Sequence, residues 1–206
     1  MFNEYLDRLG REITTGEFSE EVINARKEYF SKVGEVFEDD KSFENKMISF
    51  TEWYYFDRNL MKYQKTPLEY FIDKNKAIFC KEELDIYKEF LKNIHSVFYV
   101  KKIKLGEVIV KDLFESKKIS VSQKNSKQYF LKGDIFEGRL IPFNEKYYFS
   151  GSVCFHPLTL YKKIKKAFKK IYKNQEEKTE FLFLLSSMNL ILERSRKVNV
   201  KDIYAF

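Results

Sequence analysis

Apolar residues recur at two different intervals along this chain, and the points where the interval changes constrain the fold more than any other feature. Up to about residue 95 they recur every three or four positions, as in Phe2, Leu6 and Leu9, which is typical of amphipathic helices. From Ser96 to Pro157 the interval is two, which is typical of half-buried strands. Pro157 then opens a second helical region, so the sequence predicts an α+β protein.

The segment from Ser96 to Pro157, in which apolar residues alternate, contains six candidate strands. Asn144 and Glu145 separate the last two strands, as a two-residue hairpin loop would. The connections are too short for crossover helices, so we expect an antiparallel sheet that forms a small barrel or curls strongly. The predicted strands are 96–103, 107–112, 118–122, 128–131, 134–143 and 146–155.

Three regions follow from these changes: helices over 1–95, a β module over 96–157 and helices over 158–206. In the first region, Thr66 followed by Pro67 and Glu69 is a strong helix start signal. A fifth helix should end at His95. We expect the two C-terminal helices to pack back on the N-terminal ones, so that 158–206 forms one compact unit with 1–95.

Several features favour a location in the cytoplasm. The longest nearly uncharged run, Phe181 to Leu192, has 12 residues, well short of the ~20 that cross a bilayer, so we expect no membrane span. The first residues are acidic and lack a basic segment before an apolar one, so we expect no signal peptide. Cys80 and Cys154 are the only cysteines, which suits a reducing compartment.

Charge is distributed unevenly along the chain. The first 60 residues hold 8 Lys or Arg against 14 Asp or Glu, whereas residues 158–206 hold 12 against 5. Such a basic region can contact nucleic acid or an acidic protein surface, and a basic amphipathic helix also suits an anionic membrane. It can equally be a solvated face, or pair with the acidic N-terminal third. The helix predicted over 158–173 carries seven lysines, of which Lys165 is one; the candidates for binding are the other six, Lys162, Lys163, Lys166, Lys169, Lys170 and Lys173.

A second candidate surface surrounds the only tryptophan. Rings occupy four successive positions, 53–56, on a predicted helix, so they cannot all face one core. An exposed patch of Trp53, Tyr55, Asp57 and Arg58 would make the chain a protein–protein interaction module. The sequence leaves the oligomeric state open.

Four side chains offer the donor atoms of a zinc site: Cys80, His95, Cys154 and His156. Cys80 and His95 would lie at opposite ends of one helix, roughly 22 Å apart at 1.5 Å per residue. Cys154 and His156 share one face of a strand, but two ligands do not make a structural site. The sequence therefore predicts no metal and no cofactor.

Catalytic patterns are scarce. A nuclease would need Asp112 or Asp134 together with Glu137 as metal ligands. The alternative is structural: Glu137 and Arg139 share one face of a strand, where a cross-strand ion pair accounts for them. No phosphate-binding glycine loop or nucleophile motif occurs. We therefore expect a non-enzymatic binding or regulatory protein, with the interaction module and the metal-dependent phosphodiesterase as alternatives.

Four segments carry a resemblance to a protein family. They read GEVFEDD (34–40), WYYFDR (53–58), KGDIFEGRLIPF (132–143) and CFHP (154–157). With them the chain resembles an uncharacterised bacterial family of about 200 residues with no assigned activity. The resemblance spans most of the chain, and it implies a cytoplasmic bacterial protein without implying a mechanism.

Overall fold

The computed structural model describes residues 2–123, 129–171, 174–195 and 197–206. These residues form eight α-helices, two short 3₁₀ segments and five strands, which confirms the α+β class. The helices are α1 (Phe2–Ile13), α2 (Ser19–Val33), α3 (Phe43–Phe56), α4 (Pro67–Asn75), α5 (Lys81–Phe90), α6 (Tyr161–Lys170), α7 (Gln175–Arg194) and α8 (Val200–Ile203). The strands are β1 (Ile94–Lys104), β2 (Glu107–Asp112), β3 (Lys118–Ser122), β4 (Ile135–Phe143) and β5 (Lys146–His156).

The five strands form a sheet that closes on itself in the order β1-β2-β3-β5-β4, with β4 returning to β1. Four of the pairings are antiparallel, but β3 and β5 run parallel where Val121 faces Tyr147. The prediction of a wholly antiparallel sheet was therefore wrong for one pair. The reason is geometric, since an odd number of strands cannot alternate in direction all the way round a closed ring.

Most predicted strands occur close to their expected bounds. The strands at 107–112 and 118–122 match, and the other three differ by one or two residues at their ends. The strand expected at 128–131 is wrong over 129–131, which carry no strand, and residue 128 lies outside the described residues. Asn144 and Glu145 form the predicted hairpin loop, with φ of +49° and +62°.

Aromatic rings fill much of the interior of the sheet. Phe98 and Phe136 lie 5.5 Å apart between ring centroids, and Phe130 stacks on Phe149 at 4.6 Å. Valines from β1, β2, β3 and β5 complete this core. Phe149 and Val153 of β5 belong to this core, and the outward-facing side chains of that strand are left for other elements to cover.

The N-terminal helices build a separate core that reaches the sheet through α3. The start signal of α4 is confirmed, because Thr66 and Glu69 form a reciprocal capping box. The predicted end of the fifth helix was wrong: α5 ends at Phe90, and His95 lies in β1. The helical spacing of apolar residues continues through Ile94, but that side chain packs against the interior of the sheet.

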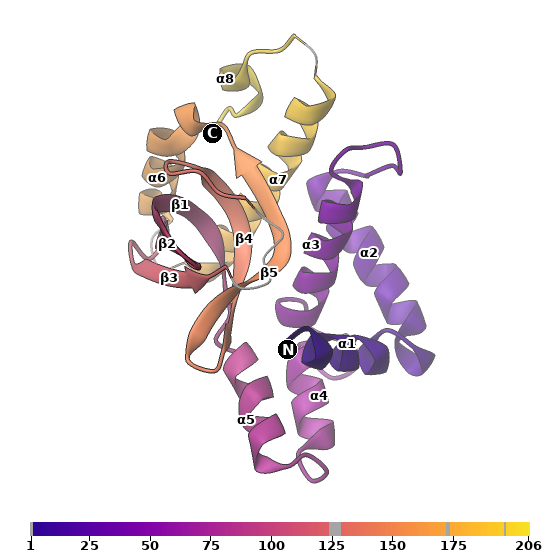
Figure 1. Cartoon of the computed structure of the whole chain (residues 1–206). Helices are drawn as coiled ribbons and strands as arrows, with labels where there is room; N and C mark the ends of the chain where they lie inside the picture. The colour runs from indigo at the N-terminus through magenta and orange to yellow at the C-terminus, as the bar shows by residue number, and fades with distance from the viewer. Residues whose placement is uncertain (1, 124–128, 172–173, 196) are drawn as a thin grey trace.

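The two C-terminal helices take different positions. α7 lies between the sheet and α2, so it joins the N-terminal helices as expected (Figure 1). α6 lies beside α7, where its buried Ile164 and Phe168 pack with α7 and with Leu113 and Phe114, which follow β2. The expectation that α6 packs on the N-terminal helices was therefore wrong. Within the described residues, no helix combines the length and the apolar character that crossing a bilayer requires.

Candidate functional site

The outer surface of α6 is basic. Its apolar stripe faces the sheet, so the lysines on its other positions face outward, and those with exposed side chains are Lys162, Lys166, Lys169 and Lys170. None of these four forms an ion pair within the described residues. Lys163 differs, because its ammonium donates to the Tyr204 backbone oxygen at 2.6 Å. Lys173 lies outside the described residues.

Two tyrosines join α6 to β1. The rings of Tyr99 and Tyr161 lie 4.7 Å apart between centroids. Lys101 Nζ lies 4.8 Å from the centre of the Tyr99 ring, and Lys165 Nζ lies 5.9 Å from the centre of the Tyr161 ring. The lysines of α6 therefore continue onto the β1–β2 hairpin, where two more lysines are exposed. We call this surface the basic face; its residues are Lys101, Lys102, Lys104, Lys162, Lys165, Lys166, Lys169 and Lys170.

The acidic N-terminal third pairs with other cations. Glu21 and Glu28 both bind Arg58, with Oε to guanidinium distances of 2.5 and 2.7 Å. Asp40 binds Arg194 at the end of α7. None of these pairs involves a residue of α6. The acids of the first 60 residues therefore do not neutralise the basic face through any ion pair among the described residues.

The predicted aromatic patch is not exposed as a whole. Trp53 is 6% exposed and packs against Tyr29 and Phe183, and Arg58 is 8% exposed. Tyr55 lines a cleft between α1, α3 and β5. Asp57 pairs with Arg139 of β4. The core therefore accommodates the rings, because α3 is in contact with other helices on one side and with β5 on another.

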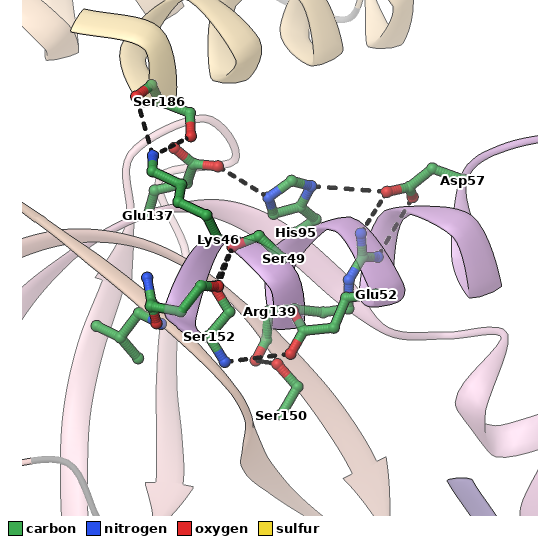
Figure 2. Close-up of polar contacts among 12 residues, drawn as sticks. Lys46, Ser49, Glu52, Asp57, His95, Glu137, Arg139, Ser150, Ser152 and Ser186 are labelled. Carbon is green, nitrogen blue, oxygen red and sulfur yellow. Dashed lines mark hydrogen bonds and ion pairs between the residues drawn. The ribbon is translucent and has the colours of Figure 1, made fainter. Parts of the chain in front are cut away.

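A polar network lies between α3 and the outer face of β1, β4 and β5 (Figure 2). His95 Nε2 lies 3.2 Å from Glu137 Oε1, and His95 Nδ1 lies 3.7 Å from Asp57 Oδ2. Arg139 binds both carboxylate oxygens of Asp57. The predicted cross-strand pairing is therefore confirmed for Glu137, whose partner His95 lies on β1, and was wrong for Arg139, whose partner Asp57 directly follows α3.

Charges within this network outweigh the effect of burial on its acids. Burial raises the pKa of Asp57, but the Arg139 charge and the His95 hydrogen bond outweigh burial and bring that pKa to about 2. Burial likewise raises the pKa of Glu137, but the hydrogen bond and the charge of His95, together with other nearby positive charge, lower it by a larger sum. Both carboxylates are therefore anionic at neutral pH, and each has a cationic or hydrogen-bonding neighbour.

Side chains of α3 also bind the backbone of β5. The Ser152 amide donates to Glu52 Oε1 at 3.2 Å, and the Val153 amide donates to Asn45 Oδ1 at 3.0 Å. In this stretch β5 bulges opposite Gly138 and Leu140. The bulge shifts the register by two residues and sets Cys154 directly opposite Glu137.

A further cluster on the same face is formed by Glu137, Cys154 and His156. One ligand atom from each of these residues lies within 4.8 Å of the others, and all three residues are buried. Burial raises the pKa of Cys154 to about 12 and lowers that of His156 to about 4, so both are neutral at pH 7. Sequence reasoning found Cys154 and His156 on one face but missed Glu137 as the third member.

The other predicted ligand sets do not assemble. Cys80 is the exposed N-cap of α5, whereas His95 lies in β1. The prediction that the two residues stand at opposite ends of one helix was therefore wrong. Asp112 accepts hydrogen bonds from Ser96 and from the Phe114 amide. Asp134 caps the turn at Leu131. Among the described residues, these carboxylates do not form a metal-binding group with Glu137.

Comparison with known proteins gives one family match. A family model described as "Family of unknown function (DUF7986)" matches residues 8–185. Neither the curated proteins nor the solved structures contain a match to the chain.

Proposed function

The chain belongs to this family of unknown function, and because membership assigns no activity, we propose from its surface that it binds nucleic acid through the basic face. The observation that carries the proposal is the contact between Tyr99 and Tyr161, which joins the lysines of α6 to those of the β1–β2 hairpin. A row of lysines favours binding of a phosphate backbone, since each phosphate that a lysine neutralises releases condensed counterion.

Two further observations support a polyanion as the partner. The exposed lysines of α6 form no ion pair within the described residues, so binding a phosphate need not break an existing contact. Glu21 and Glu28 of α2 and Asp40 of the loop before α3 are engaged with Arg58 and Arg194 instead. A lysine ammonium binds phosphate as a point charge, without the fixed donor geometry of an arginine guanidinium. A surface made of lysines therefore favours binding with little sequence preference.

Fluorescence anisotropy with labelled single-stranded DNA and RNA tests the proposal. We expect binding at 50 mM salt that weakens as salt rises, with a linear dependence of log affinity on log salt. Absence of binding at 50 mM salt, or binding without a salt dependence, would contradict it. Polyglutamate of similar length and labelling serves as the second probe. Binding to polyglutamate but to neither nucleic acid would point to an acidic protein surface and overturn the proposal.

A matched pair of triple variants locates the binding surface. Replacing Lys162, Lys166 and Lys169 by Gln removes three charges from the basic face and should reduce the magnitude of the salt slope by roughly 2 for a single strand. The control replaces Lys76, Lys81 and Lys88 by Gln; these exposed lysines near α4 and α5 form no ion pair among the described residues. Equal losses in both variants would mean that net charge alone drives binding.

A further inference from the structure

Two strands of the sheet bring a nitrogen, a sulfur and an oxygen donor together. The register of the β4–β5 pair sets Glu137 opposite Cys154, and His156 follows two residues along β5, on the same face. The three ligand atoms lie within 4.8 Å of one another, and His156 Nε2 is 3.9 Å from Glu137 Oε2. Bond lengths of 2.0–2.3 Å place the ligand atoms of a tetrahedral zinc site about 3.5 Å apart, so a small contraction would suffice.

Two of these donor atoms are buried without a partner. His156 Nε2 and Glu137 Oε2 have no hydrogen-bond partner among the described residues. The His156 side chain is 0% exposed and that of Glu137 is 10% exposed. Buried polar atoms in folded proteins are nearly always satisfied, and each exception calls for an explanation. The two atoms lie 3.9 Å apart in the cluster with Cys154, so one bound ion could satisfy both.

The remaining polar atoms of the two side chains are already held. His156 Nδ1 lies 3.1 Å from the Tyr204 hydroxyl, and His95 Nε2 lies 3.2 Å from Glu137 Oε1. In the tautomer whose Nδ1 donates to the Tyr204 hydroxyl, the free lone pair of His156 is on Nε2, 3.9 Å from Glu137 Oε2. Metal-binding histidines and carboxylates are commonly oriented by outer hydrogen bonds of this kind. The orientation therefore exists before any ligand binds.

We propose that Glu137, Cys154 and His156 bind a divalent transition-metal ion of the zinc type, which links β4 to β5 on the covered face of the sheet. Thiolate and imidazole donors select zinc over magnesium or calcium, which prefer oxygen ligands. On binding, the Cys154 thiol releases its proton to solvent, and bonds form from the metal to sulfur, to Nε2 and to the carboxylate oxygen. A water molecule completes a tetrahedral set.

The charges around the cluster suit an ion that carries two positive charges and displaces one proton. Lys46 is the nearest buried ammonium, and it is fixed by two hydrogen bonds to Ser186, at 2.9 Å to the backbone oxygen and 2.6 Å to Oγ. Asp57 lies beyond His95 and adds a second carboxylate to the network. Together with the Cys154 thiolate, Glu137 and Asp57 offset the metal and part of the positive charge of Lys46 and Arg139.

The site also involves the C-terminal segment. Tyr204, which orients His156, directly follows α8, and its ring is fully buried against the helices of the C-terminal region. Binding a metal at Nε2 would therefore strengthen the contact between β5 and the end of the chain. This consequence is independent of the basic face, so the metal proposal stands or falls separately from nucleic-acid binding.

Cobalt(II) and zinc test the proposal on the full-length chain after chelator treatment. We expect one Co²⁺ per chain, with a thiolate-to-cobalt charge-transfer absorption that added Zn²⁺ abolishes by displacement. The melting temperature should rise with the logarithm of free Zn²⁺, since the ion binds only the folded state. A chain that binds no Co²⁺, or that binds it without a charge-transfer band, would overturn the assignment.

The chain supplies its own control, because it has two cysteines in different places. Cys80→Ser changes the exposed cysteine at the start of α5 and should leave the cobalt spectrum and stoichiometry unchanged. Cys154→Ala should abolish the charge-transfer band, and circular dichroism would verify that this variant folds. Glu137→Gln, which keeps an acceptor for His95, should weaken zinc binding at least tenfold. Loss of the band in Cys80→Ser, or its persistence in Cys154→Ala, would contradict the proposed ligands.

Discussion

Arg139 of β4 and Asp57, the residue after α3, form a bidentate ion pair that fastens the helical layer to the sheet. Arg139 Nη1 lies 3.3 Å from Asp57 Oδ1, and Nη2 binds Oδ2. The Arg139 side chain is 1% exposed, and its guanidinium lies 5.0 Å from the centre of the Phe56 ring. A buried guanidinium depends on its carboxylate partner, because its charge cannot be solvated.

Breaking this pair on one side should cost more than replacing both partners. Asp57→Asn leaves the buried Arg139 charge without its anion and should lower the free energy of unfolding by roughly 3 kcal/mol. The double variant Asp57→Leu with Arg139→Met removes both charges and should be less destabilised than Asp57→Asn. Urea unfolding of Asp57→Asn, Asp57→Leu, Arg139→Met and the double variant measures this. Additive losses would show that the two side chains are not coupled.

Lys46 should stabilise the contact between α3 and α7. It is 1% exposed, and both of its hydrogen bonds go to Ser186. Lys46→Met keeps the aliphatic stem but removes the ammonium, so we expect a loss of about 2 kcal/mol in urea unfolding. Lys41→Met, at an exposed position just before α3, is the control and should change stability little. A Lys46→Met chain as stable as the wild type would contradict this role.

Acid should weaken the contact between Asp40 and Arg194. The hydrogen bond from Arg194 lowers the Asp40 pKa from 3.8 to about 2. A carboxylate with a lowered folded-state pKa contributes stability that is present above its ordinary pKa and is lost as pH falls through the folded value. The stability difference between wild type and Asp40→Asn should therefore be constant above about pH 5 and shrink as pH falls toward 2.

Urea unfolding at a series of pH values measures that difference. Asp39→Asn is the matched control, because Asp39 is adjacent and exposed and forms no ion pair within the described residues. The free energy of unfolding of Asp39→Asn should stay close to that of the wild type at every pH. A gap for Asp40→Asn that grows on acidification would have the wrong sign and would contradict the assignment.

Local patterns predicted much of the fold. The interval of two located β2 and β3 at their observed bounds, and the residues around Thr66 located the start of α4. The prediction for His95 was wrong because Ile94 continues the helical spacing, and only the closed sheet gives that side chain a different core to enter. The position of α6 was missed for a related reason, since an apolar stripe does not specify the element that it covers.

The buried cluster could be predicted only in part. Alternation on β5 correctly placed Cys154 and His156 on one face, but it gave no sign that helices cover this face. Counted from the two-residue loop, an unbroken hairpin sets Glu137 opposite Ser152. The bulge near Gly151 moves Cys154 into that position, and a bulge of this kind leaves the pattern of alternation unchanged. Register therefore had to come from the structure.

Lysine footprinting in the presence of oligonucleotide tests the central claim, that the basic face binds nucleic acid, most directly. Acetylation by a lysine-specific reagent, read by mass spectrometry, reports each lysine separately in one sample. We expect single-stranded nucleic acid to protect Lys162, Lys166 and Lys169 on α6 together with Lys102 and Lys104 on the hairpin, while Lys76, Lys81 and Lys88 react as before. Protection of the second group, or no protection on α6, would contradict it.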